Sequence, residues 1–303
     1  MSPYFPFNGE PYSPAMGIKP LDLIEWFQPD ASLAQDLDEK RAILATAPHL
    51  ALAVVAEPAL AAETSKATVE LLRLVIENLT RYHPLHYALD PRGIRIRASS
   101  HTVQVPDANS ECDAGTLLRR IAGIVQEDVC LLSPNRPARL AAGLVCFPSR
   151  WNIADKVGLD ASAIHEPVPG FAQTLAQPTT SFLDRLTPER SFARLNWTIH
   201  DSALRFAPHS VAGRTDLTPE NVLGETFLRI ERQTLRRLPS SGFVVFTIRT
   251  YIDRLDGLVN DPDRRKRLLG TLSSMPEEAV AYKGMTRFFR PLLQALANRA
   301  GSQ

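Results

Sequence analysis

A change of periodicity at residue 128 most constrains how this chain can fold. Before it, apolar residues recur every three or four positions, as in helices, and after it they alternate or run together, as in strands. Turn-forming residues 133–137 join the first two apolar runs, which predicts a hairpin. Five strands are expected, at 128–132, 139–147, 191–199, 227–234 and 242–251. The pattern therefore predicts an α+β fold around an antiparallel sheet.

Helical segments are expected before, within and after the strand region. They lie at 33–47, 59–82, 113–126, near 153–158, at 170–186 and over much of 254–299. The order is two strands, a helical crossover and three strands. The expected division is an N-terminal arm and helical region (1–127), a sheet core (128–253) and C-terminal helices packed on that core (254–303), all as one compact unit.

Composition excludes several classes of protein. The chain has 303 residues, of which 44% are apolar and 22% charged, as in ordinary globular proteins. A net charge of +1 gives no sign of a nucleic-acid partner. The N-terminus lacks a secretory signal, and the apolar run at 48–56 is far shorter than the roughly 20 residues of a membrane span. A cytoplasmic protein without a membrane partner is expected.

Three cysteines, Cys112, Cys130 and Cys146, are too few and too widely spaced for an iron–sulphur cluster, a zinc site or a disulfide framework. Three buried thiols are expected instead.

His165 stands at the start of a turn that contains Pro167, Pro169 and Gly170. Both prolines fix φ, so the imidazole is held by a stiff frame. A stiffly held ring nitrogen suits a metal or haem ligand. The alternative is a helix start that happens to contain a histidine.

Period-two alternation gives each of the last three strands one polar face. These faces carry Arg194, Asn196, Thr198 and His200, then Arg229, Glu231 and Gln233, then Thr247, Arg249 and Tyr251. Two interpretations remain open. The sheet has one solvated side, as antiparallel sheets commonly do, or these residues line a polar pocket.

Several short blocks occur in a characteristic order. They include Pro6-Phe7, Met16 to Leu21, the segments 38–41 and 126–129, Phe147-Pro148-Ser149-Arg150-Trp151, the His165 turn, Arg194-Leu195-Asn196-Trp197, the segment 228–239 and the segment 246–251. Each block is weak alone, but the ordered set, from residue 6 to about 252, resembles the haem-dependent oxidative N-demethylase family.

The resemblance implies a PAS-like five-stranded antiparallel sheet with helices on one face, flanked by helical N- and C-terminal segments. It also implies haem b, with His165 as the axial ligand of the iron. Cationic partners for the propionates would come from Arg150, Arg194, Arg229, Arg232 and Arg249. Trp151 and Trp197 would flank the macrocycle, with core packing as the alternative for each.

The activity implied is oxidation of a methyl carbon on a small secondary amine such as dimethylamine, with O2, releasing formaldehyde. Glu231 with Tyr251 would hold the amine cation, because a buried cation needs a carboxylate or an aromatic face. Asn196 would complete the catalytic set. The alternative for Glu231 is a salt bridge to Arg229 or Arg249 on a solvated sheet.

Electrons would have to come from a separate reductase. The chain lacks a dinucleotide-binding fingerprint and the cysteine spacing of an iron–sulphur site, so NADPH, FMN and iron–sulphur are expected only on a partner chain. Two other functions stay open: a non-catalytic PAS-type haem or small-ligand sensor, and a haem-free structural partner. The absence of an output module in this sequence argues against the sensor.

Two rival sites are weaker. His83 and His86 have a metal-compatible spacing but no third ligand near in sequence. His200-Asp201-Ser202 contains the residue types of a hydrolase triad, yet neighbours on a strand point to opposite faces.

Overall fold

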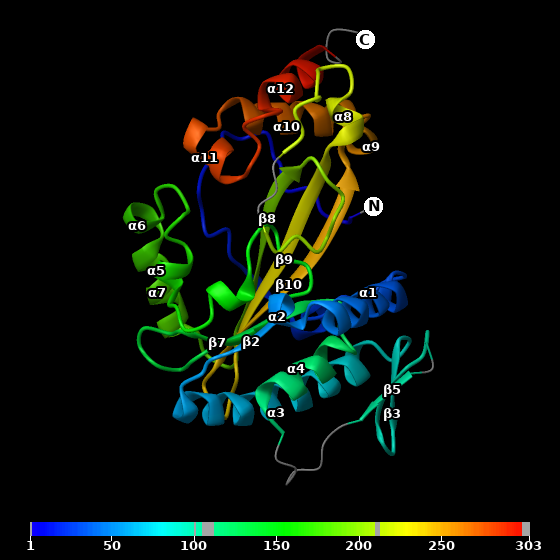
Figure 1. Cartoon of the computed structure of the whole chain (residues 1–303), viewed down its shortest axis with the longest axis vertical. Coiled ribbons are helices and arrows are strands. Elements are labelled where there is room, and N and C mark those ends of the chain that lie inside the picture. The colour runs from blue at the N-terminus through cyan, green and yellow to red at the C-terminus, as the bar shows by residue number, and fades with distance from the viewer. Residues whose placement is uncertain (1, 100, 105–111, 210–212, 299–303) are drawn as a thin grey trace.

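A seven-stranded antiparallel sheet forms the centre of the computed structural model, which describes residues 2–99, 101–104, 112–209 and 213–298 (Figure 1). Its strand order is β1-β8-β9-β10-β6-β7-β2. The five expected strands are present as β6 (Asp128–Leu132), β7 (Leu140–Leu144), β8 (Ser191–His200), β9 (Phe227–Arg237) and β10 (Val244–Arg254). The α+β class is confirmed.

Two short strands enlarge the sheet beyond the five that were expected. β1 (Lys19–Leu21) pairs with the start of β8, and β2 (Leu52–Val54) pairs with β7. Each has three residues, too few for an alternating pattern to show in the sequence. The N-terminal region thus contributes both edges of the sheet.

The strand register defines two faces of the sheet. Glu231 lies opposite Asn196 on one side and Thr250 on the other, so these three side chains project to the same face, here called the crossover face. Ile230, between Trp197 and Tyr251, projects to the opposite face, here called the N-terminal face.

The N-terminal face is covered by helices from the first part of the chain. These are α1 (Leu33–Thr46), α2 (Pro48–Ala51), α3 (Pro58–Tyr82) and α4 (Ala114–Ala122), while η1 (Leu23–Glu25) is a short 3-10 turn. Leu71 and Leu117 share one buried cluster with Val129 and Val245 of the sheet. The helix expected at 59–82 therefore docks onto the sheet as α3 through its buried apolar side.

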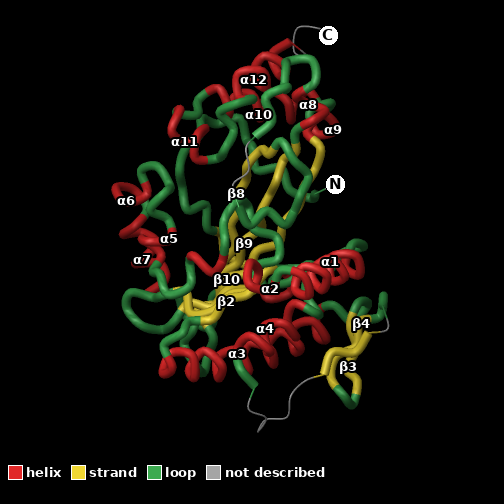
Figure 2. Tube along the Cα trace, viewed as in Figure 1, coloured by secondary structure: helices red, strands yellow, loops and turns green. Residues whose placement is uncertain are grey.

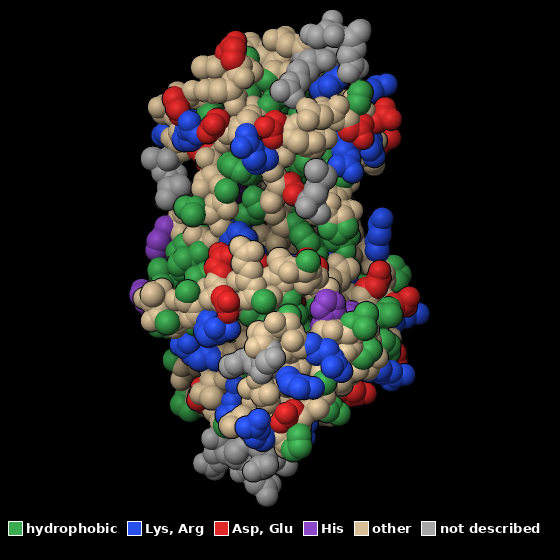
Figure 3. Space-filling model, turned by 90° about the vertical axis from the view of Figure 1, so that its right-hand side faces the viewer, with side chains coloured by type: hydrophobic (Ala, Val, Ile, Leu, Met, Phe, Trp, Pro, Cys, Tyr) green, Lys and Arg blue, Asp and Glu red, His purple; other side chains and the backbone are tan. Residues whose placement is uncertain are grey.

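The far end of the same face is covered by the C-terminal helices. They are α8 (Val222–Glu225), α9 (Leu255–Leu258), α10 (Pro262–Ser273), α11 (Glu277–Tyr282) and α12 (Phe289–Asn298). Leu268 and Leu292 form a second buried cluster with Phe7 of the N-terminal arm and Ile230 of β9. Seen from the right of Figure 1, hydrophobic side chains gather in a band across the middle of the molecule, and charged ones lie toward both ends (Figure 3).

The crossover face is covered by η2 (Ile153–Asp155), α5 (Ala161–Ile164), α6 (Phe171–Thr174) and α7 (Ala176–Arg185). Leu183 of α7 packs with Leu235 and Val244 of the sheet. The helices that lie between β7 and β8 are thus on one face, and the flanking N- and C-terminal helices cover the other. Two separate apolar layers, one from each side, bury a sheet whose strands are apolar on both faces at this end.

A second, three-stranded sheet was not anticipated. It consists of β3 (Tyr87–Asp90), β4 (Gly93–Ile96) and β5 (His101–Gln104), and lies beside α3 and α4 at one end of the molecule (Figure 2). Gly93 has a φ of +154°, and a Cβ built there would lie 2.0 Å from the carbonyl oxygen of Val103. Only glycine permits this close approach of β4 to β5.

Cys130 and Cys146 are buried, and burial raises the pKa of both thiols. Cys112 is only half-buried, so the expectation of three buried thiols holds for two. In the part of the chain that the structure describes, no helix is long and apolar enough to cross a membrane.

Candidate functional site

Four polar side chains meet on the crossover face and are here called the polar cluster: Arg194, Asn196, Glu231 and Gln233. Strand register sets Arg194 opposite Gln233 and Asn196 opposite Glu231. The Glu231 carboxylate accepts hydrogen bonds from Asn196 Nδ2 at 3.3 Å and Gln233 Nε2 at 3.1 Å. Arg194 Nη1 donates to Gln233 Oε1 at 3.2 Å. The alternation read from the sequence therefore does bring these residues together.

Arg229 lies beneath the polar cluster and neutralises its carboxylate. Its side chain is 1% exposed, and Nε lies 3.2 Å from Glu231 Oε1. Its Nη atoms donate to the backbone carbonyls of Phe147 and Arg205. The alternative expected for Glu231, a salt bridge to Arg229, is thus present. It is buried, however, so the prediction that this side of the sheet is solvated is wrong for β9.

His165 follows α5 as its C-cap, and one of its ring nitrogens has no hydrogen-bond partner among the described residues. Its Nδ1 lies 2.7 Å from the carbonyl oxygen of Ala161. Because a carbonyl only accepts, Nδ1 carries the proton and Nε2 has a free lone pair. The ring stacks on Phe171, with centroids 4.8 Å apart and an interplanar angle of 13°. No hydrogen bond joins Nε2 to any of the described residues.

Burial lowers the pKa of His165, and the positive charge of Arg194 lowers it further, although the bond to Ala161 opposes this. The imidazole is therefore neutral at pH 7, which is the form that ligates metals. Ile164, its neighbour, packs against the same buried cluster as Phe246 of the crossover face. His165 thus lies on the same side of the sheet as the polar cluster.

Lys283, which sequence reasoning missed, borders the same site. It follows α11, and its Nζ lies 2.5 Å from the carbonyl oxygen of Trp197 and 4.5 Å from the centroid of that indole. Burial, reinforced by the charge of Arg194 and opposed by that of Glu231, lowers the pKa of Lys283 to about 8. A single lysine in a helical segment carries no local signal that it reaches the edge of a distant strand.

Arg150 lies beside the site but is already paired. It has a φ of 61°, and its Nη2 lies 2.6 Å from Asp201 Oδ1. His200 Nε2 lies 3.2 Å from Ser149 Oγ, and burial, with the charges of Arg150 and Arg229, lowers the pKa of His200 to about 3. His200 bonds Ser149 while Asp201 pairs with Arg150, so the His200-Asp201-Ser202 triad is not formed.

Tyr251 projects to the N-terminal face, away from Glu231. It lies opposite Ile230, its ring meets Tyr4 edge-on at 5.6 Å, and its hydroxyl donates to Gln28 Oε1 at 3.3 Å. The expectation that Glu231 and Tyr251 line one pocket is therefore wrong. The reason is the register of β9 and β10, which sets Thr250 beside Glu231.

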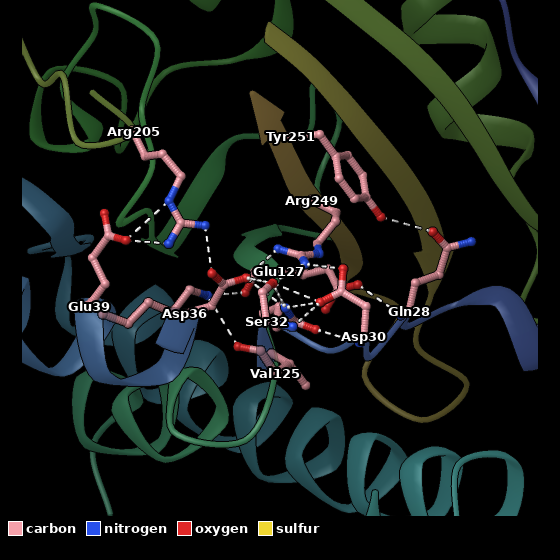
Figure 4. A network of polar contacts seen from close by, with 12 residues as sticks. Gln28, Asp30, Ser32, Asp36, Glu39, Val125, Glu127, Arg205, Arg249 and Tyr251 are labelled. Carbon is pink, nitrogen blue, oxygen red and sulfur yellow. Dashed lines mark hydrogen bonds and ion pairs between the residues drawn. The ribbon is translucent and has the colours of Figure 1, made fainter. Parts of the chain in front are cut away.

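Arg249 also projects to the N-terminal face, into the network of Figure 4. Its guanidinium lies 2.9 Å from Asp30 and 2.8 Å from Asp36. Burial opposes the ionisation of Asp30, but hydrogen bonds from Gln126 and Ser32 and the charge of Arg249 outweigh it and lower the pKa to about 2. The structure thus gives Arg249 acidic partners on the face opposite His165.

The other candidates divide between the two faces. Arg232 donates to the backbone carbonyl of Glu25 on the N-terminal face. Trp197 packs there too, with its ring 4.7 Å from that of Phe7. Trp151 packs on the crossover face, in the cluster that contains Ile164. Of the two tryptophans, only Trp151 lies on the side of His165.

The residues on the crossover face fit a haem. Haem needs an axial nitrogen and cations for its two propionates. His165 offers Nε2, and Arg194 has a buried Nε with no partner among the described residues. Protein groups alone leave this cation incompletely paired. No group of three metal-ligating side chains occurs in the described ranges, which leaves the His83–His86 site without support.

A family model described as "Haem-dependent oxidative N-demethylase, alpha subunit-like" matches residues 17–293. The match spans most of the chain and includes the sheet, the polar cluster and Lys283. The resemblance drawn from the ordered sequence blocks is confirmed.

Proposed function

Because the chain belongs to the haem-dependent oxidative N-demethylase family, alpha subunit-like, we propose that it is a haem-binding catalytic subunit that removes a methyl group from a small secondary amine. Haem b, when bound, supplies the chemistry that oxidises the methyl carbon with O2. The chain's own residues bind the cofactor, hold the amine and position the charges around them.

The geometry of His165 carries this proposal. Metal-ligating histidines characteristically donate their other ring N–H to a carboxylate or a backbone carbonyl, which fixes the ring and its tautomer. Nδ1 of His165 makes such a bond to Ala161, and the stacked Phe171 ring restricts rotation. Nε2 is the atom proposed to ligate the iron.

Glu231 is proposed to bind the amine. Its carboxylate accepts three hydrogen bonds, from Arg229, Asn196 and Gln233, and a carboxylate offers about four acceptor positions. One position remains for an ammonium proton. Asn196 and Gln233 hold the carboxylate in place, so they act as positioning residues rather than as contacts to the substrate.

A separate reductase is proposed to deliver the electrons from NADPH through FMN and iron–sulphur. The family description as "alpha subunit-like" supports a multi-subunit assembly. Support for this division of labour also comes from the sequence, which lacks a nicotinamide-binding fingerprint.

The five central strands are proposed to be a PAS-like core within residues 128–253. β6 and β7 precede the crossover helices α5–α7, and β8, β9 and β10 follow them. β6 lies between β7 and β10, so the first strand of the set is an interior strand of the sheet. β1 and β2 then extend this core at its edges.

Reconstitution with haemin tests the proposal. The wild-type protein is expected to give a Soret band, and His165→Ala should retain little haem although it folds. His165→Gly should regain the band when imidazole is added, because free imidazole can replace the missing ring. His49→Ala, an exposed histidine on α2, is the matched control and should bind haem normally.

Unchanged haem content and spectrum in His165→Ala would overturn the ligand assignment, and His200 would become the next candidate. Turnover is tested with dimethylamine, O2 and an added flavin–iron–sulphur reductase. Formaldehyde should appear only when the reductase is present. Haem binding without any formaldehyde would instead support the sensor.

A further inference from the structure

The ammonium of Lys283 is fixed at the edge of β8 that faces away from β9. β1 pairs with this edge only as far as Ala193, so Trp197 and Thr198 have no strand partner on that side among the described residues. Thr198 Oγ1 donates to the carbonyl of Lys283 at 3.2 Å, and Lys283 Nζ donates to the carbonyl of Trp197 at 2.5 Å. One of the three ammonium donors thus has an acceptor among the described residues, and the backbone is anchored as well.

Arg194 is the neighbouring cation. Its Nη1 donates to Gln233, while its buried Nε has no partner in the described part of the chain. Arg194 lies on β8, three residues before Trp197, whose carbonyl binds the Lys283 ammonium. The two cations therefore lie along the same strand, and the charge of Arg194 helps to lower the pKa of Lys283.

Positive charge exceeds negative charge in this region. Glu231 is the carboxylate that acts on both Lys283 and Arg194, and it is already paired with Arg229 at 3.2 Å. Two half-buried cations with incomplete hydrogen bonding repel one another and lose hydration. A bound anion would relieve both costs. A carboxylate suits them because a guanidinium fork and an ammonium each donate to its oxygens.

We propose that Lys283 and Arg194 together bind one carboxylate of the haem. This inference rests on the proposed function, and it adds a lysine from the C-terminal helices to a propionate site for which the sequence suggested only arginines. The other predicted cations are occupied: Arg150 pairs with Asp201, and Arg249 pairs with Asp30 and Asp36 on the opposite face.

The test compares haemin with its dimethyl ester, in which both propionates are uncharged. Dissociation constants are measured by Soret titration for wild type, Lys283→Met and Arg194→Lys. Lys283→Met should weaken haemin binding by at least about tenfold, the worth of one charge-assisted hydrogen bond. It should change ester binding by less than about twofold, since the ester offers no charge to lose. Arg194→Lys keeps the charge but loses the fork, and should show a smaller loss, again confined to haemin.

Lys266→Met, which removes an exposed lysine from α10, is the control for net charge and should not affect either ligand. Lys283→Gln removes the charge but keeps a donor for the Trp197 carbonyl, so weaker haemin binding by this variant reports the loss of charge and not a loss of the structural hydrogen bond. The inference is overturned if Lys283→Met weakens haemin and ester equally, or weakens neither. If the wild-type protein binds the ester through His165 and binds haemin no more tightly than the ester, the inference fails but the proposed function stands. If wild type binds neither porphyrin, the proposed function fails with it.

Discussion

Lys40→Met is expected to destabilise the fold strongly, because it leaves a buried carboxylate without its cation. Lys40 on α1 is 1% exposed, Asp128 at the start of β6 is 0% exposed, and Nζ lies 3.2 Å from Oδ1. The same ammonium donates to the backbone carbonyls of Val125, at 3.3 Å, and Glu127. Because the Asp128 side chain is fully buried, its charge is not solvated once the lysine is gone.

The magnitude follows from the contacts that survive. Removing one partner of a buried ion pair costs about 3–5 kcal/mol. Asp128 keeps two backbone donors, Cys146 N at 3.0 Å and Phe147 N at 2.8 Å, which favours the lower end of that range. The two carbonyls that lose their donor favour the upper end, since each unsatisfied buried group costs about 1–3 kcal/mol. A loss of about 4 kcal/mol in unfolding free energy is expected.

Urea unfolding followed by circular dichroism measures this loss. Lys40→Met combined with Asp128→Asn should be less destabilised than the two single changes added together, by about 2 kcal/mol, because the second change removes the stranded charge. Lys66→Met, on the exposed side of α3, is the control and should stay within about 0.5 kcal/mol of wild type. A loss below about 1 kcal/mol, or strict additivity, would refute the reasoning.

Two further predictions concern the carboxylates on either face of the sheet. Glu231→Gln should weaken the amine-induced Soret shift by two orders of magnitude or more, since a desolvated charge partner is worth about 3–5 kcal/mol; a change under tenfold would retire Glu231 as the amine ligand. Arg249→Met should raise the pH at which acid unfolds the protein. Asp30, with its pKa lowered to about 2, stabilises the fold above its unfolded pKa near 3.8 and loses that contribution as pH falls toward 2. Without Arg249 this loss should begin at higher pH, and an unchanged acid midpoint would contradict the assignment.

The strands and long helices were predictable because their periodicity is local. Residues 227–234 and 242–251 alternate clearly, and both became strands. Period two tells which residues of one strand share a face, but not which residue of the next strand lies beside them. The turn between β9 and β10 pairs Arg237 with Val244, and this sets Glu231 beside Thr250. A register shifted by one residue would have set Tyr251 beside Glu231. The wrong prediction of a pocket shared by Glu231 and Tyr251 thus corresponds to a shift of one residue in the turn between β9 and β10.

Lys283 and the Lys40–Asp128 pair lie beyond this kind of prediction for another reason. Each depends on contacts between residues more than 80 positions apart. A lysine in a helix is normally a solvated residue, and nothing in its neighbours in sequence distinguishes a buried one. His165 could be found because its prolines act on it directly, whereas these lysines are defined by what packs against them.

The buried pair of Lys40 and Asp128 also bears on the site, because Asp128 lies opposite Ile248 and so projects to the crossover face. Asp128 accepts the amide protons of Cys146 and Phe147, and so fixes the turn that follows β7. The carbonyl of Phe147 in turn accepts from Arg229, which holds Glu231 on the crossover face. Loss of Lys40 would therefore act on Glu231 through backbone that Asp128 positions. If this chain of contacts is rigid, a variant at Lys40 that still folds should show weakened amine binding, although Lys40 itself bonds Asp128 and not Glu231.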